Sequence, residues 1–187
     1  MVRLELPEIE TLRRDLEREA VGKKIKSAEA LVLKSLPRHK TRKSFEDGLV
    51  GAKILSSERL GLLILLRLDN ERTLVISLGE NGRILRAATK DKHTDDTVAV
   101  ITLDKAGDLR ILDSNGTSAI HAVPNEDLAS VLPDPSHMGL DLHTKPVSWV
   151  EFGRWVLSKR MPLKLLLTDE SVFVGIGEIY SNEILFD

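Results

Sequence analysis

The sequence predicts an α+β fold in which an N-terminal helix lies on a two-layer antiparallel β-sandwich and a small helical region follows. Three patterns predict it: an amphipathic segment at the start, short apolar runs between turn residues in the middle, and helix-start signals towards the end. With 42% hydrophobic and 30% charged residues in 187, the chain has the composition of a globular protein with a sizeable core.

Residues 7–20 are expected to form the first helix. Ile9, Leu12 and Leu16 recur at spacings of three and four with charged residues between them, so they share one helix face. Pro7 stands in the first turn, which tolerates proline because its N–H groups have no partner inside the helix. We expect Leu12 and Leu16 to pack on the sandwich rather than face solvent.

Between residues 24 and 112, short apolar runs predict strands. Turn residues such as Glu80-Asn81-Gly82 separate the runs. The runs expected as strands are Ala30–Leu33, Ile54–Leu55, Leu60–Leu68, Thr73–Leu78, Arg83–Arg86, Thr97–Leu103 and Leu109–Leu112. Seven or eight strands at this spacing indicate a β-sandwich or a flattened barrel.

Helical signals return after residue 124. A short helix is expected from Asn125, and a proline-bearing linker follows it. A capping box at Ser148 opens a helix that extends to about Lys159, and further short helices are expected from Pro162 and near Gly177. The expected domains are a β-sandwich over 1–122, a linker with a short helix over 123–147, and a helical domain over 148–187.

The composition excludes several classes of protein and site. The chain has no cysteine, which excludes disulfides, thiolate zinc sites and cysteine nucleophiles, and its five histidines have no metal-site spacing. The longest apolar run, Leu60 to Leu66, is interrupted by Arg67, so no transmembrane helix is expected. The first ten residues lack the apolar core of a signal peptide, and we expect an intracellular, cytoplasmic protein.

Basic residues are concentrated in one segment of an otherwise acidic chain. The net charge is −2, yet residues 20–45 carry eight Lys or Arg against Glu29 alone. Such a segment is either a strip that faces phosphates or a solvated surface. Weak, salt-sensitive DNA binding through this basic strip would use Lys34, Arg38, Lys40, Arg42 and Lys43.

Four stretches, which together span nearly the whole chain, occur in a characteristic order. They are LELPEIETLRRDLE (4–17), VGKKI (21–25), the strand blocks through HTDDTVAVITL (93–103), and PLKLLLTDESVFVGIGEIYSNEILF (162–186). They resemble the formamidopyrimidine-DNA glycosylase and endonuclease VIII family of base-excision repair enzymes. The resemblance implies DNA in a cleft between the β-sandwich and a helical domain. The chain stops within the helix–two-turns–helix motif, and the zinc finger is absent, so no cofactor is expected.

The catalytic nucleophile of the family that this chain resembles has no counterpart in this sequence. In the family it is the secondary amine of an N-terminal proline, which a glutamate follows; the matching positions here are Leu4 and Glu5, after three further residues. The Leu4 nitrogen is a peptide amide, which cannot form an iminium ion. Glu5 matches the catalytic glutamate and Glu8 a second acidic position. Either could act as an acid or base, or complement the helix dipole.

Most other functional positions of the family also differ here. The strand-turn lysine, the histidine before the glycine turn, the gap-filling methionine, the loop arginine and phenylalanine, and the phosphate-binding asparagine correspond to Leu62, Ser77, Glu80, Asn115, Thr117 and Glu178. A glutamate that faces a phosphate replaces a hydrogen bond with repulsion. Lys164 retains a lysine that lies near the lesion in the family, although it could equally be a solvated lysine of a first turn.

These losses predict a pseudoenzyme that keeps the scaffold and binds a protein partner or, weakly, DNA. The alternative is an active glycosylase/lyase that uses the Val2 terminus or Lys164 as its amine, with Glu5 as acid or base. A third hypothesis is a fragment whose DNA-binding half lies elsewhere. The apolar C-terminal residues would either dock on the 148–159 helix or, as we favour, form a symmetric homodimer.

Overall fold

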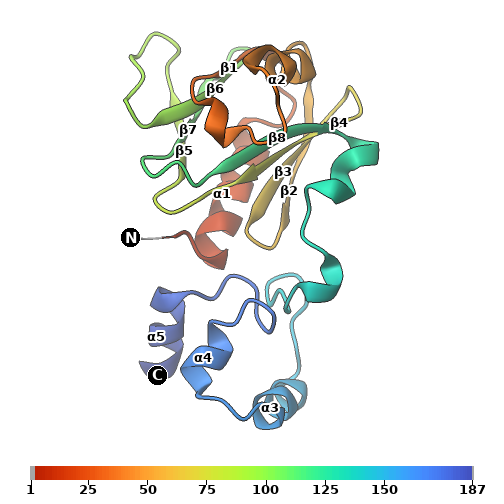
Figure 1. Cartoon of the computed structure of the whole chain (residues 1–187), viewed down its shortest axis with the longest axis vertical. Helices are drawn as coiled ribbons and strands as arrows, with labels where there is room; N and C mark the ends of the chain where they lie inside the picture. Colours follow the sequence, from red (N-terminus) through yellow and green to blue (C-terminus); the bar gives the residue numbers. More distant parts are fainter. Residues whose placement is uncertain (1–2, 187) are drawn as a thin grey trace. The chain divides into compact units, whose positions relative to one another are not determined.

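The computed structural model describes residues 3–186, apart from the side chain of Pro135, and confirms the α+β fold (Figure 1). The chain divides into two compact units, Met1–Leu132 and Pro133–Asp187. The division falls inside the segment that we expected to act as a linker.

The first unit is a sandwich of two four-stranded antiparallel sheets. One sheet has the order β1-β6-β7-β5 and the other the order β2-β3-β4-β8. Their bounds are β1 (Ile25–Ala30), β2 (Ile54–Leu60), β3 (Leu63–Leu68), β4 (Arg72–Ser77), β5 (Arg83–Ala87), β6 (Thr97–Leu103), β7 (Gly107–Leu112) and β8 (Ala119–Pro124). Side chains from both sheets, among them Ile64, Leu74, Ile101 and Ile111, form one buried core.

The helix α1 (Leu6–Glu19) contacts the edge strand β2. Leu16 is buried in the core and Leu12 packs against it half-buried, which confirms the expected helix face. Two polar side chains of α1 also bind the peptide groups of Ser57: Arg13 Nη1 donates to its carbonyl at 3.2 Å, and Glu17 Oε2 accepts from its N–H at 2.9 Å. An edge strand exposes such groups, and here the helix satisfies them.

A second helix, α2 (Arg42–Leu49), lies beside β1 and β8 (Figure 1). Its Phe45 and Leu49 are buried in the core. Just before it, His39 Nε2 accepts a hydrogen bond at 3.1 Å from the N–H of Ala122, on the edge strand β8. The sequence pattern did not predict α2, because half of its residues are charged and only Phe45 and Leu49 supply large apolar side chains.

The expected strands differ from the structure at three places. The strand predicted over Ala30–Leu33 is wrong, because β1 ends at Ala30 and a 3-10 turn, η1, follows at Leu33–Ser35. The run Leu60–Leu68 contains a hairpin, where the chain reverses at Gly61 with a positive φ of 58°. The strand β8 was not predicted; it pairs with β4 and completes the second sheet.

The second unit is helical and small. It contains η3 (Pro135–His137), α3 (Trp149–Ser158), α4 (Leu163–Leu167) and α5 (Glu178–Phe186). Its core is formed by buried Leu166, Leu167, Val172, Phe173 and Ile176. The capping box at the start of α3 is confirmed, because Ser148 Oγ accepts from the Glu151 N–H at 3.3 Å and Glu151 Oε2 accepts from the Ser148 N–H at 3.0 Å.

The 3-10 helix η2 (Asn125–Ser130) belongs to the first unit rather than to the second. Its Leu128 packs with Leu65, Val75 and Val123 in a second apolar cluster of that unit. The short helix predicted from Asn125 is therefore present, as a 3-10 helix on the sandwich.

Candidate functional site

The segment that enters α1 brings Leu4, Glu5 and Glu8 together. Glu5 is the N-cap of α1 and forms a capping box with Glu8, whose Oε2 accepts from the Glu5 N–H at 3.0 Å. The Glu5 side chain in turn accepts from the backbone N–H of Glu8. Glu5 is also buried, with 5% of its surface exposed. These contacts give both carboxylates a structural part in starting the helix.

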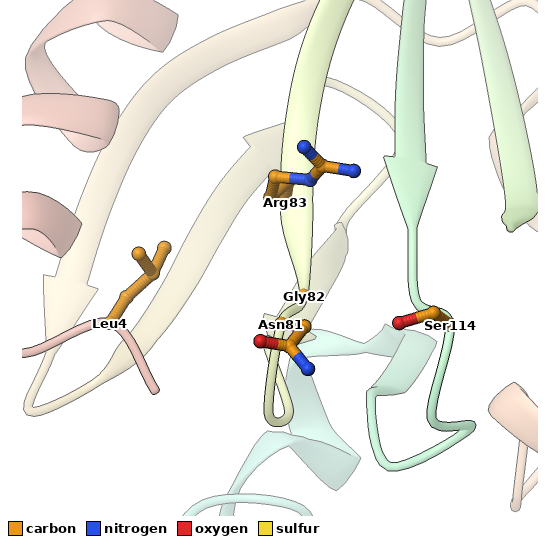
Figure 2. A pocket seen from close by; sticks show the side chains of 5 residues that line it. All are labelled: Leu4, Asn81, Gly82, Arg83 and Ser114. Carbon is orange, nitrogen blue, oxygen red and sulfur yellow. The ribbon is translucent and has the colours of Figure 1, made fainter. Parts of the chain in front are cut away.

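Beside Leu4 lies an open pocket of about 380 Å³. Its other lining residues are Asn81, Gly82, Arg83 and Ser114, so it joins the segment before α1 to the start of β5 and the end of β7 (Figure 2). Arg83 forms an ion pair with Asp96 at 3.2 Å. Of the residues that are described as lining the pocket, none carries an amine, an imidazole or a carboxylate.

The loop after β7 is held rigidly by Asp113. Its carboxylate accepts from the N–H groups of Asn115, Gly116 and Ser118 at 3.0, 2.8 and 2.5 Å. Burial raises the pKa of Asp113, but these hydrogen bonds more than offset burial and hold the pKa below its ordinary value. The carboxylate therefore stays ionised and fixes the loop in one conformation.

The same loop is bonded to the turn that precedes β5. Thr117 Oγ1 accepts from the N–H of Glu80, and Ser118 Oγ accepts from the N–H of Gly79, both at 3.0 Å. The two loops approach so closely at Gly79 that no side chain would fit between them, because a Cβ there would lie 2.0 Å from Thr117 Oγ1. The two loops thus form one hydrogen-bonded unit next to the pocket.

The structure places Leu62 at the tip of the β2–β3 hairpin, where it packs half-buried against the main core. Ser77 ends β4 and is also half-buried. Neither residue offers a charged or basic group at these positions.

The residues of the basic strip lie along η1, the following loop and the first turn of α2, and all are exposed: Lys34, Arg38, Lys40, Arg42 and Lys43. Two of them are anchored. Arg38 donates to the carbonyl of Ser130 and, at 3.0 Å, to its hydroxyl, and Arg42 donates to the carbonyl of Leu31 at 2.9 Å. Lys34 Nζ lies 3.6 Å from the point where a Cβ on Gly116 would stand, beside the Asp113 loop.

In the second unit, Lys164 is paired rather than isolated. Its ammonium donates to Asn182 Oδ1 at 2.6 Å and lies 3.8 Å from a carboxylate oxygen of Glu178. Val2, the other amine considered above, lies outside the described residues.

A family model for the formamidopyrimidine-DNA glycosylase N-terminal domain matches residues 4–120, more than half of the chain. The chain belongs to the formamidopyrimidine-DNA glycosylase family. A curated formamidopyrimidine-DNA glycosylase from Heliobacterium modesticaldum is 32% identical over 184 residues, which are 97% of this chain and 66% of that relative. One from Acidothermus cellulolyticus is 31% identical, with coverage of 97% and 64%. The chain thus spans slightly less than two thirds of these relatives.

A solved structure has the same fold. The formamidopyrimidine-DNA glycosylase of Lactococcus lactis, non-covalently bound to DNA that contains an AP site, superposes with a TM-score of 0.81 at 22% identity. The match covers 97% of this chain and 68% of that one. At this identity the match establishes the fold, while function must be argued from the residues present.

Within the glycosylase family, the zinc finger needs thiolate or imidazole ligands. This chain has no cysteine, and among residues 3–186 no group of three or more His, Asp or Glu is placed to hold a metal. In the described part of the chain, every helix is too short or too polar to span a bilayer.

The pocket residues Asn81, Arg83 and Ser114 were not predicted as site residues from the sequence. The turn Glu80-Asn81-Gly82 was visible as a turn, but its proximity to Leu4 depends on how the sheets pair. Only the resemblance to the glycosylase family brought the loop around Asn115 into consideration.

Proposed function

We propose that this chain is a DNA-binding member of the glycosylase family that does not excise bases. The observation that carries the proposal is the pocket beside Leu4. Leu4 presents a peptide nitrogen where the family resemblance implies a secondary amine, and the described lining offers no amine, imidazole or carboxylate. A Schiff-base mechanism needs an unprotonated amine, and an amide nitrogen has no basic lone pair.

The state of Glu5 supports the same proposal. A general acid or base must reach the group whose proton it transfers. Glu5 is buried and takes part in the capping box with Glu8, which is a structural use of the carboxylate. If Glu5 and Glu8 left this capping box to act on a substrate, the N-terminus of α1 would lose part of its stabilisation, typically about 1 kcal/mol.

The two hydrogen-bonded loops next to the pocket argue against a mechanism in which one of their side chains inserts between stacked bases of DNA. Thr117 Oγ1 and Ser118 Oγ are both used to hold the neighbouring turn. Glu80 at that turn is exposed and acidic, so it would repel a phosphate rather than fill a gap between bases. We therefore propose contacts to the DNA backbone, without eversion of a base.

The basic strip provides the cations for such contacts. Hydrogen bonds to carbonyl groups hold Arg38 and Arg42 in place, and each guanidinium keeps further donors for phosphate oxygens. Lys34 extends the strip to the Asp113 loop. With about four phosphates neutralised, log K should fall against log salt with a slope of roughly −3 to −4.

The second candidate function is an active glycosylase/lyase that uses Lys164 or the Val2 amine, with Glu5 as acid or base. Lys164 favours this candidate because it is retained at a family lysine position. The Lys164 ammonium, however, is hydrogen-bonded to Asn182 and has Glu178 nearby, so its nitrogen would have to leave both partners before it could attack a sugar carbon.

Anisotropy titrations with labelled duplexes test the proposal. We expect equal affinity for undamaged, abasic-analogue and 8-oxoguanine duplexes, and no strand nicking. The double variant Lys40→Gln/Lys43→Gln should flatten the salt slope by roughly 2, whereas Lys90→Gln/Lys92→Gln, in an exposed loop outside the strip, should not change it. Selective binding of damaged DNA or nicking would contradict the proposal.

The homodimer stays a prediction. Ile184, Leu185 and Phe186 of α5 are exposed, with Phe186 at 89%, which is compatible with association but does not identify a partner. Light scattering at high protein concentration tests it: a dimeric mass supports the prediction and a monomeric mass contradicts it.

A further inference from the structure

Three of the four sheet edges in the first unit are closed by the chain itself. The edge strands are β1 and β5 in one sheet and β2 and β8 in the other. On β1, the backbone of the loop after α2 bonds the N–H and the carbonyl of Ile25, at 2.8 and 2.9 Å. On β2, two side chains of α1 bind both peptide groups of Ser57. On β8, the ring of His39 and the guanidinium of Arg72 bind those of Ala122.

The fourth edge, that of β5, is bare. Within the part of the chain that the structure describes, no group outside its own sheet forms a hydrogen bond with the peptide groups of residues 83–87. Of the eight strands that are described, β5 alone has no buried residue. Every second residue of an edge strand directs its N–H and carbonyl away from the neighbouring strand. The edge of β5 therefore presents a row of unpaired donors and acceptors.

A pocket of about 270 Å³ lies between this bare edge and α1. Leu12 and Leu16 line it from the helix, and Leu109 lines it from β7. Ile84 and Leu85 line it from β5 itself. Leu16 and Leu109 are buried, whereas Leu85 is 46% exposed. Apolar side chains thus stand directly beside the unpaired peptide groups of the strand.

The helix α1 and the strand β5 run side by side. Leu4, just before α1, shares the pocket of Figure 2 with Arg83 at the start of β5. Glu19, at the end of α1, forms an ion pair with Arg86 near the end of β5, at 2.7 Å. At about 3.4 Å per strand residue and 1.5 Å per helix residue, β5 spans about 17 Å and α1 about 21 Å. The groove between them is long enough for an extended segment of about five residues.

We propose that the groove between α1 and β5 binds an extended polypeptide segment of a partner protein, which adds a strand beside β5. In this mode of recognition, main-chain hydrogen bonds supply the affinity and pockets for alternate side chains supply the specificity. A phosphodiester backbone only accepts hydrogen bonds, so it cannot pair with the carbonyl groups of the edge, whereas a peptide backbone pairs with both kinds of group. The apolar lining selects aliphatic side chains at alternate positions of the partner. The proposal does not rest on the DNA contacts proposed above.

A displayed library of random eight-residue peptides, selected against the full chain, tests the proposal. Enriched peptides should carry Leu, Ile or Val at alternate positions, and a labelled synthetic copy should bind in an anisotropy titration. N-methylation of one alternate set of its amides should weaken binding roughly 10- to 100-fold, because those amides donate to β5. Methylation of the other set should have little effect, since that edge of the added strand faces away from β5.

Two exposed leucines on edge strands provide a matched pair of variants. Leu85→Glu, in the groove, should weaken peptide binding roughly tenfold or more, because it sets a charge against the aliphatic side chains of the added strand. Leu55→Glu, at a position 53% exposed on β2, should leave binding unchanged, because α1 already covers that edge. Circular dichroism would confirm that both variants are folded. Amide hydrogen exchange at residues 83–87 of the unchanged chain should slow when the peptide is added.

Four results would overturn the proposal. One is a selection whose enriched peptides bind Leu85→Glu as tightly as the unchanged chain. Another is slowed exchange that is confined to the second unit, which would place the peptide elsewhere. The third is exchange at residues 83–87 that slows with rising protein concentration and without peptide, which would assign the edge to a second copy of the chain. The fourth is slowing of this segment by duplex DNA but not by peptide, which would assign it to nucleic acid.

Discussion

At the scale of single residues, Glu10 and Arg59 bind α1 to the sandwich. Glu10 Oε2 accepts from Arg59 Nε at 3.2 Å, and the Arg59 side chain is only 2% exposed. Arg13 and Arg14 bond the same carboxylate. Burial raises the pKa of Glu10, but the hydrogen bonds from the three arginines outweigh it and lower the pKa to about 2.

The substitution Glu10→Gln should therefore destabilise the chain by about 3 kcal/mol, because it removes a charged partner from the buried Arg59 guanidinium. Urea unfolding at neutral pH measures this. Asp15→Asn, which removes an exposed partner of Arg18, is the matched control and should cost under about 1 kcal/mol. Equal losses for both variants would contradict the assigned role of Glu10.

The same residue predicts an acid dependence. A carboxylate whose pKa falls from 4.5 in the unfolded chain to about 2 in the folded one stabilises the fold above pH 4.5. That stabilisation is lost as the pH falls from 4.5 towards 2. The free energy of unfolding of Glu10→Gln should therefore fall less steeply than that of the unchanged chain over this interval.

At the scale of elements, the two loops beside the pocket depend on a glycine. An Ala Cβ at Gly79 would lie 2.0 Å from Thr117 Oγ1 and 2.5 Å from the Thr117 carbonyl carbon. Gly79→Ala should force the loops apart and cost about 1–3 kcal/mol in unfolding free energy. Gly48→Ala, where the new Cβ meets only ordinary contacts in α2, should be neutral or stabilising. A neutral Gly79→Ala would show that the loops are not locked.

The contact between His39 and β8 predicts a second pH effect. Burial, with a further contribution from Arg72, holds the pKa of His39 below its ordinary value. The neutral ring stabilises the fold above pH 6.5, and this contribution is lost as the pH falls through the lowered pKa. His39→Gln keeps an acceptor for Ala122 without titrating there, so thermal unfolding should show a flatter pH profile. His121, whose pKa is lowered by burial, Arg38 and His39, should supply the remaining slope.

The elements also show what periodicity can and cannot predict. The first helix and the capping box at Ser148 follow local rules, and both are present in the structure. The strand β1, with sequence IKSAEA, carries too few apolar residues to be recognised, because only its pairing with β6 decides which side is buried. The hairpin at Gly61 was hidden inside a continuous apolar run, because apolar Leu60 and Leu62 stand on either side of the turn glycine.

At the scale of the whole molecule, the chain has the fold of its family, and we propose that the residues at the family's key positions no longer support its chemistry. Glu5 and Glu8 were predicted from sequence as candidate carboxylates, and their pairing at the start of α1 follows the capping rule. The pocket of Leu4, Asn81 and Ser114 could not be predicted, because it joins three segments that only the sheet pairing brings together. Residue types at a site are visible in sequence, whereas their neighbours are set by tertiary structure.

Borohydride trapping with abasic-site DNA tests the central claim most directly, because a reduced covalent adduct requires a reactive amine on the protein. We expect no adduct above that of a heat-denatured control. A denaturing gel that showed a stable protein–DNA band would contradict the account. If such a band appeared, its loss in Lys164→Ala or after acetylation of the N-terminus would identify the amine responsible.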